Sequence, residues 1–148
     1  LPVVVTSTNG LAVIPDNDTV VGLSSPISIS TTGTVRSVTV VLHQIAHGFG
    51  GEVDTFLVSP LGTQRELTTD NGGTGFFSTI LADTAAAVVP TSGVHRGRFR
   101  PDQPISGASP AAGFAGEASA GAWTLRAFDD ANADTGALGR WTLAMCVE

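Results

Sequence analysis

Two Trp-Thr-Leu triplets near the end of the chain, at residues 123–125 and 141–143, constrain its fold more than any other feature. Each triplet opens an alternating stretch, because every second residue counted from Trp123 or Trp141 is apolar. A period of two is typical of a strand with one buried face. We therefore expect both tryptophans in the core, since an indole buries a large apolar area. The acidic segment between them, residues 129–136, predicts a hairpin-like connection.

Other short segments of the chain also alternate or are rich in β-branched residues, and glycine and proline separate them. No stretch carries a helical stripe, and residues 93–120, which include His95, have the glycines and prolines of a loop. This pattern predicts an all-β domain, an antiparallel jelly-roll sandwich. Besides the two tryptophan segments, the expected strands are Val3–Thr6, Ile27–Ser30, Val35–Ile45, Val53–Ser59 and Phe76–Ala82.

The composition narrows the class of protein. A length of 148 residues is that of one domain, and 42% apolar residues exclude disorder. No apolar run is long enough to span a bilayer. The net charge is −6 and all seven basic residues are arginines, which disfavours nucleic acid as a partner.

Cys146 is the only cysteine, so no internal disulfide forms, and we expect its side chain in the core. The start at Leu1 predicts a piece excised from a longer protein, and the composition suits secretion.

Catalytic motifs are weak in this chain. The Asp-Thr-Gly tripeptide at 134–136 matches the aspartate motif of aspartic proteases and many subtilases, but it lies in a polar loop without partner groups. A triad of His47, Asp54 and Ser59 is disfavoured, because Ser59 precedes Pro60 in a turn and nothing nearby resembles a nucleophile elbow. We predict that the chain alone is not an enzyme.

Calcium is the cofactor that the sequence favours most. Oxygen-bearing residues at positions 130, 132 and 134 alternate as hard cations require, although Thr135 and Trp141 occupy positions that exclude an EF-hand. Capping of the backbone amides of their own turns is the favoured interpretation of these side chains, and calcium is the alternative. The candidate ligands are Asp129, Asp130, Asn132 and Asp134, with Asp16 and Asp18 second, and Glu52 and Asp54 third.

Three alternating arginines, Arg96, Arg98 and Arg100, are expected to share one face of a strand. They form either a docking surface for an acidic partner or a solvated strand edge that blocks unwanted pairing.

Several motifs taken together carry a resemblance to a known family. They are the His-turn-Gly-Glu-Val of residues 47–53, the Leu-Val-Ser-Pro-Leu-Gly-Thr of 57–63, Leu-Ala-Asp at 81–83, Gly-Arg-Phe-Arg-Pro at 97–101, and the tryptophan segments of 121–129 and 134–143. As a set they resemble the P domain (P/Homo B domain) that follows the subtilisin-like catalytic domain of proprotein convertases of the furin and kexin type. Two departures are Glu52-Val53 where the family has Asp-Leu, and a longer turn at Gly48–Gly51.

The resemblance implies a galactose-binding-like jelly roll over residues 1–148. It also implies a non-catalytic role: packing on a subtilisin-like serine endopeptidase domain of the same secreted polypeptide, supporting its folding or stability, and shaping its response to calcium and pH. The alternatives are a stand-alone binding module for carbohydrate or protein, and a structural module associated with secretion. A sugar platform is disfavoured because the chain has no tyrosine and alternation turns both tryptophans inward.

Overall fold

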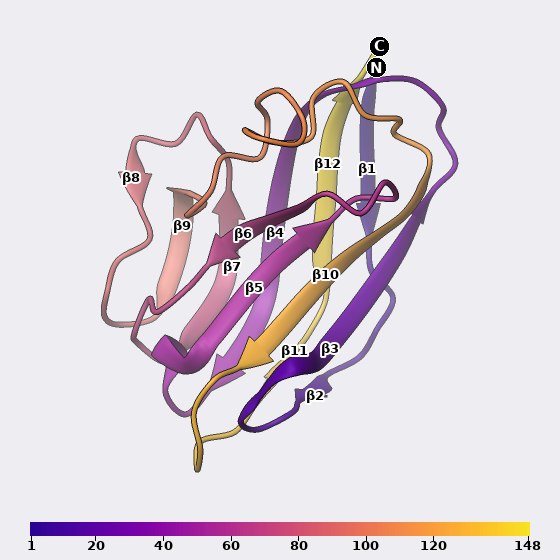
Figure 1. The fold of residues 1–148 in the computed structure, drawn as a ribbon. Helices are drawn as coiled ribbons and strands as arrows, with labels where there is room; N and C mark the ends of the chain where they lie inside the picture. The colour runs from indigo at the N-terminus through magenta and orange to yellow at the C-terminus, as the bar shows by residue number, and fades with distance from the viewer.

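Two β-sheets face one another and enclose the core, as the computed structural model of residues 1–148 shows (Figure 1). The only helix is the 3₁₀ turn η1 (Gly50–Glu52), and no helix is long and apolar enough to cross a membrane. The all-β sandwich predicted from the alternation is therefore confirmed, while its jelly-roll connectivity stays a prediction.

The larger sheet, sheet A, has the strand order β1-β12-β4-β7-β9-β8, and β11 joins it by pairing with both β4 and β2. Its strands are β1 (Pro2–Thr6), β2 (Ala12–Ile14), β4 (Val35–His47), β7 (Gly75–Leu81), β8 (Ala87–Val88), β9 (His95–Arg100), β11 (Gly136–Leu138) and β12 (Trp141–Val147). Sheet B has the order β3-β10-β5-β6. Its strands are β3 (Asp18–Ile29), β5 (Val53–Val58), β6 (Gln64–Thr68) and β10 (Gly121–Asp129).

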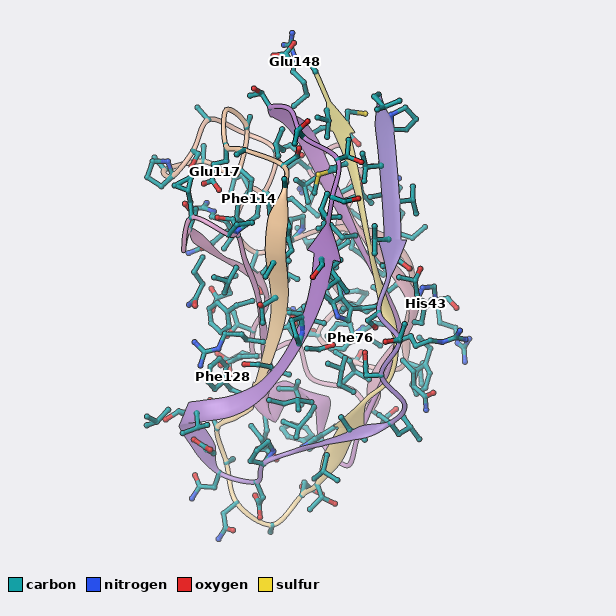
Figure 2. All side chains as sticks on the ribbon, turned by 90° about the vertical axis from the view of Figure 1, so that its right-hand side faces the viewer. His43, Phe76, Phe114, Glu117, Phe128 and Glu148 are labelled. Carbon is teal, nitrogen blue, oxygen red and sulfur yellow. The ribbon has the colours of Figure 1, made fainter.

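The core is one cluster of 25 buried residues contributed by both sheets. Trp123 on β10 and Trp141 on β12 are fully buried, which confirms the alternation read from the sequence. Each indole N–H finds an acceptor: that of Trp123 bonds to the Ser119 carbonyl oxygen, and that of Trp141 to Ser25 Oγ, both at 2.9 Å. Figure 2 shows the ring of Phe76 between the sheets and the side chain of His43 pointing away from them.

The predicted hairpin between the two tryptophan strands is wrong, because β10 belongs to sheet B and β12 to sheet A. The acidic segment instead crosses from one sheet to the other at the lower end of the sandwich in Figure 1 and continues into β11. Each tryptophan strand has partners on both sides, since β10 pairs with β3 and β5, and β12 with β1 and β4.

Three further expectations need correction. Cys146 is exposed and not in the core, because it alternates with the buried Met145 and Val147 on β12. The segment 93–120 is not wholly a loop, since β9 begins at His95, which is itself buried. The sandwich is also not purely antiparallel, because β9 runs parallel to both β7 and β8.

Candidate functional site

A buried histidine–carboxylate pair joins the two sheets at the end of the sandwich where β4 and β10 finish. His47 Nε2 lies 2.8 Å from Asp129 Oδ2, and both side chains are completely enclosed. Gly136 on β11 is opposite His47 in the register, and a methyl group there would collide with the imidazole ring. The glycine of the Asp-Thr-Gly tripeptide is therefore explained by room for His47 and not by catalysis.

The second ring nitrogen of His47 is engaged as well. His47 Nδ1 lies 2.8 Å from the carbonyl oxygen and 3.1 Å from the amide nitrogen of Phe49, in the turn that follows β4. Ser59 is buried at the far end of β5, and its Oγ has no hydrogen-bond partner. The imidazole is thus held by Asp129 and backbone groups, and it forms no nucleophile–base pair with this serine.

Glu52, at the end of η1, approaches the buried pair. The ligating atoms of His47, Glu52 and Asp129 all lie within 4.8 Å of one another. Glu52 Oε2 is enclosed and accepts no hydrogen bond. Burial raises the pKa of the Glu52 carboxyl, and the negative charges of Asp134 and Asp129 raise it further. An unpartnered carboxylate oxygen beside further carboxylates is an arrangement that a bound cation stabilises.

More carboxylates continue from this cluster along the outer side of sheet B. Asp54 on β5 has an enclosed Oδ1 without a hydrogen-bond partner. Its pKa is raised mainly by burial and also by the charges of Asp130 and Asp70, against a hydrogen bond from the Thr69 side chain that lowers it. The negative charge at this end is therefore dense and is balanced by little positive charge.

The structure brings only part of the acidic loop predicted to bind calcium into the cluster of His47 and Glu52. Asp129 lies in the cluster with His47 and Glu52, whereas Asp130 and Asp134 lie outside it, and Asn132 is exposed. Asp130 donates its backbone N–H to the Glu52 carbonyl oxygen at 2.9 Å. The Asp134 carboxylate lies against Gly48, where a larger residue would displace it.

Asp18, of the second candidate pair, caps its own turn. Its Oδ1 accepts the amides of Val20 and Val21, each at 2.9 Å, and these bonds lower its pKa. Asp16 is exposed on the preceding turn. The capping role is thus visible at Asp18, and a cation at this pair stays a prediction.

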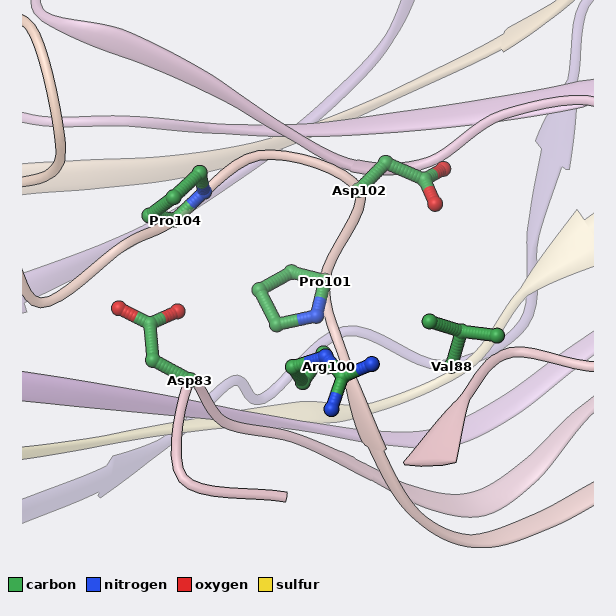
Figure 3. Close-up of a pocket in the computed structure, with 6 residues that line it drawn as sticks. All are labelled: Asp83, Val88, Arg100, Pro101, Asp102 and Pro104. Carbon is green, nitrogen blue, oxygen red and sulfur yellow. The ribbon is translucent and has the colours of Figure 1, made fainter. Parts of the chain in front are cut away.

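The three arginines do share one outward face of β9, and each has a contact within the domain. Arg98 donates to Thr84 Oγ1 at 2.8 Å, Arg100 donates to the carbonyl oxygens of Ala85 and Ala86, and Arg96 stacks on the ring of Phe77. Arg100 also borders an open pocket of about 340 Å³ (Figure 3). Its other lining residues are Asp83, Val88, Pro101, Asp102 and Pro104.

Sequence reasoning missed the partnership of His47 with Asp129. Both residues fall within motifs that carry the family resemblance, and this was the one available signal. The contact joins positions 82 residues apart, so neither periodicity nor spacing reveals it.

These features define a class: a two-sheet β domain with a buried histidine–carboxylate pair and a group of carboxylates at one end. The family model of the proprotein convertase P-domain matches residues 35–145. The chain belongs to this family, which is a non-catalytic family associated with subtilisin-like proteases. No curated protein sequence matches the chain.

Solved structures with this fold include a serine protease of Aeromonas sobria, alone and in complex with a chaperone. The free protease gives a TM-score of 0.59 at 20% identity over 100% of this chain and 28% of the protease chain. The complex gives 0.58 at 19% identity over 98% of this chain and 26% of the other. The likeness shows the shared fold, and this chain spans about a quarter of the length of those proteins.

Proposed function

We propose that this chain is the accessory P domain of a secreted subtilisin-like serine endopeptidase, and that it packs on the catalytic domain of the same polypeptide and stabilises it. The carrying observation is the family match over residues 35–145. The fold likeness supports it, since the same fold forms only part of a longer serine protease chain in Aeromonas sobria. An interface present only in the folded pair stabilises both domains by linkage.

The experiment compares the complete gene product with a version in which residues 1–148 are replaced by a glycine–serine linker. We expect the shortened protein to give less active protease and a lower melting temperature, because the catalytic domain loses the stabilising interface. A full-length variant with the exposed Val20→Ser change serves as control. Equal activity and equal melting temperature after removal of the domain would contradict the proposal.

A stand-alone carbohydrate-binding module has less support from the surface. Both tryptophans are fully buried, and Phe49 is the one aromatic residue among the large exposed apolar side chains. Stacking on a sugar ring needs an exposed aromatic face, and a single half-exposed phenylalanine offers little of one. A protein partner therefore fits the surface better than a sugar.

A second proposed function is calcium binding at the cluster of Glu52 and Asp129. Ca²⁺ takes oxygen ligands, so the two carboxylates would hold it and Asp134 would add negative charge nearby. The nitrogen of His47 is a poor calcium ligand, and its place is to fix Asp129 by their hydrogen bond. The enclosed and unpartnered Glu52 Oε2 is the observation that favours a cation.

Thermal unfolding with calcium chloride tests this site. A cation that binds only the folded state raises the melting temperature with concentration. We expect that rise in melting temperature in the wild-type domain and a much smaller rise in Glu52→Gln. The control is Glu148→Gln, which alters a surface ion pair with Arg36 at the other end of the sandwich (Figure 1) and should show the same rise as the wild type. The Asp130→Asn/Asp134→Asn variant tests the loop separately. Melting curves indifferent to calcium and chelator would favour capping over calcium.

A further inference from the structure

The outer face of sheet A is almost free of charge over four adjacent strands. β1, β12 and β7 contain no charged residue, and β4 has only Arg36 and two histidines. His47 is buried, Arg36 is the second residue of β4, and His43 is exposed on the outer side of the strand. We call the surface between Arg36 and His43 the neutral face. Its outward residues are Val4, Thr39, Val41, Ile80, Ala144 and Cys146.

The strand register shows that these residues form a continuous surface. Val4 pairs with Ala144, which pairs in turn with Thr39, and this row crosses β1, β12 and β4. A second row continues from Val41 on β4 to Ile80 on β7. Thr39 and Val41 are two residues apart on β4, about 7 Å along the strand, so the two rows lie side by side on the same face.

Two threonines beside these rows, Thr6 and Thr142, are already hydrogen-bonded within the domain. Thr142 Oγ1 lies 2.7 Å from Thr6 Oγ1 and 2.7 Å from His43 Nε2, which makes a row of hydrogen bonds across β1, β12 and β4. Polar groups that are already paired cost less free energy when a partner covers them than groups that lose bonds to water. The hydroxyl groups of Thr6 and Thr142 are therefore suited to burial by a partner.

The opposite face of the sandwich differs in charge. On sheet B, Arg126 of β10 lies over the ring of Phe128 at 4.6 Å, and Asp54 and Glu66 project from β5 and β6. Charged residues are depleted from the centre of protein interfaces, where arginine is the tolerated exception. The neutral face of sheet A thus carries fewer charged side chains than the outer face of sheet B.

Two further features suit a protein partner. A hollow of about 140 Å³ on β1, β12 and β4 is mostly apolar and includes Pro2, Val4 and Met145 in its lining, so it would accept one aliphatic side chain. The arginines of β9 border the face, since Arg98 pairs with Ile80 and Arg96 stacks on Phe77. Arginine at an interface border forms paired hydrogen bonds with carboxylates.

We infer that the neutral face is the surface on which the catalytic domain of the parent protease packs, with an aliphatic side chain in the hollow and carboxylates opposite the arginines. The inference rests on the proposed function, which supplies a partner covalently joined to this chain. That partner accounts for an uncharged face in a domain of net charge −6. In this arrangement the arginines of β9 lie at the border of the docking surface and not at its centre.

Cys146 provides a direct test, because it is exposed on this face in the isolated domain. The rate of its alkylation by N-ethylmaleimide is measured by mass spectrometry in the isolated chain and in the complete protease. We expect Cys146 in the complete protein to react at least about tenfold more slowly, which corresponds to about 1.4 kcal/mol of docking free energy. Equal rates in both proteins overturn the inference.

A pair of matched variants gives an independent readout. Thr39→Glu places a charge in the middle of the neutral face, and Thr124→Glu places one at a half-buried outward position on the central strand β10 of sheet B. We expect Thr39→Glu alone to lower the yield of active protease and to restore the reactivity of Cys146. Equal effects of both variants, or an effect of Thr124→Glu alone, contradict the neutral face.

The outcomes separate this inference from the proposed function. Loss of protease activity on removal of residues 1–148, together with an unprotected Cys146, supports the accessory role and overturns the neutral face as its surface. Unchanged activity on removal, or a gene without a protease domain, overturns both. Because the alkylation experiment needs no substitution, it decides the matter even if Thr39→Glu fails to fold.

Discussion

His47 Nε2 and Asp129 Oδ2 lie 2.8 Å apart in the interior, one on the last residue of β4 and the other on the last residue of β10. The pair ties the ends of two strands from opposite sheets and is the link between the structural core and the acidic end. Its burial makes it sensitive to the loss of either partner, since an unpaired buried charge is costly.

His47→Ala is expected to destabilise the domain by about 3–5 kcal/mol, because it leaves Asp129 buried without its partner. Asp129→Asn should cost less, since the amide oxygen still accepts a hydrogen bond from the imidazole. Denaturant unfolding of both variants, with the double variant to complete the cycle, measures the coupling. A cost below about 1 kcal/mol for His47→Ala would show that the pair contributes little.

Gly136→Ala should destabilise the domain by about 1–3 kcal/mol, because the added methyl collides with the His47 ring and the Ala46 carbonyl oxygen. Gly10→Ala is the matched control, since nothing lies within 4 Å of the added carbon at that position. Thermal unfolding of the two variants separates steric overlap from a general glycine effect. Similar melting temperatures for both would contradict the steric explanation.

Truncating either buried tryptophan, Trp123→Ala or Trp141→Ala, should cost about 3–5 kcal/mol by loss of buried area and by the cavity that remains. Phe49→Ala is a suitable control, because this ring is 51% exposed and its loss should stay within about 0.5 kcal/mol. Ser25→Ala removes the acceptor of the buried Trp141 indole N–H and the hydrogen bond to Asn9 Oδ1, and it is expected to cost about 1–3 kcal/mol. Urea unfolding followed by tryptophan fluorescence reports each value.

Asp102→Asn should raise the melting temperature at pH 7 by a small amount. Burial, and then the charges of Asp54 and Asp70, raise the pKa of Asp102 above its ordinary value of 3.8. The folded state therefore holds the proton more tightly than the unfolded state, and this contribution to stability is complete below pH 3.8 and is lost as the pH rises through the raised pKa. The asparagine variant should lose its advantage in acid.

The contribution of Asp18 to stability changes with pH in the opposite direction, so Asp18 serves as the comparison for Asp102. Its pKa is lowered by the amides of Val21 and Val20, so its contribution is present above pH 3.8 and is lost as the pH falls through the lowered value. Melting temperatures of Asp102→Asn and Asp18→Asn across pH 3 to 7 should therefore diverge in opposite directions. Parallel curves for the two variants would contradict this account.

The isolated chain should show no peptidase activity, and Asp134→Asn and Ser59→Ala should make no difference in a protease assay. The Ser59 hydroxyl is buried without a base, and the Asp134 carboxylate lies against Gly48. Peptide hydrolysis by purified protein that one of these changes abolishes would overturn the non-catalytic role. Ser59→Ala should also leave stability nearly unchanged, because the hydroxyl makes no hydrogen bond.

The sequence by itself determined the strands and the direction of their side chains. Burial of one face imposes a period of two on neighbouring residues, so the alternation at Trp123 and Trp141 was enough to place both indoles in the core. The same local rule predicts that Cys146 is exposed, because it alternates with the buried Met145 and Val147. The expectation that Cys146 lies in the core was wrong because it relied on the apolar character of cysteine and not on the alternation. Turn residues likewise marked where most strands end.

Only the tertiary structure decided which strands pair and which charges meet. The choice between a hairpin and a crossing from one sheet to the other depends on hydrogen bonds with β3, β5, β1 and β4. All four partner strands lie outside the connecting segment 129–141, so the sequence of that segment does not reveal the choice. The proximity of His47, Asp129 and Glu52 likewise arises because both sheets end at the same place. Strand propensity is a local property of the chain, whereas sheet partners and buried ion pairs are set by packing between segments distant in sequence.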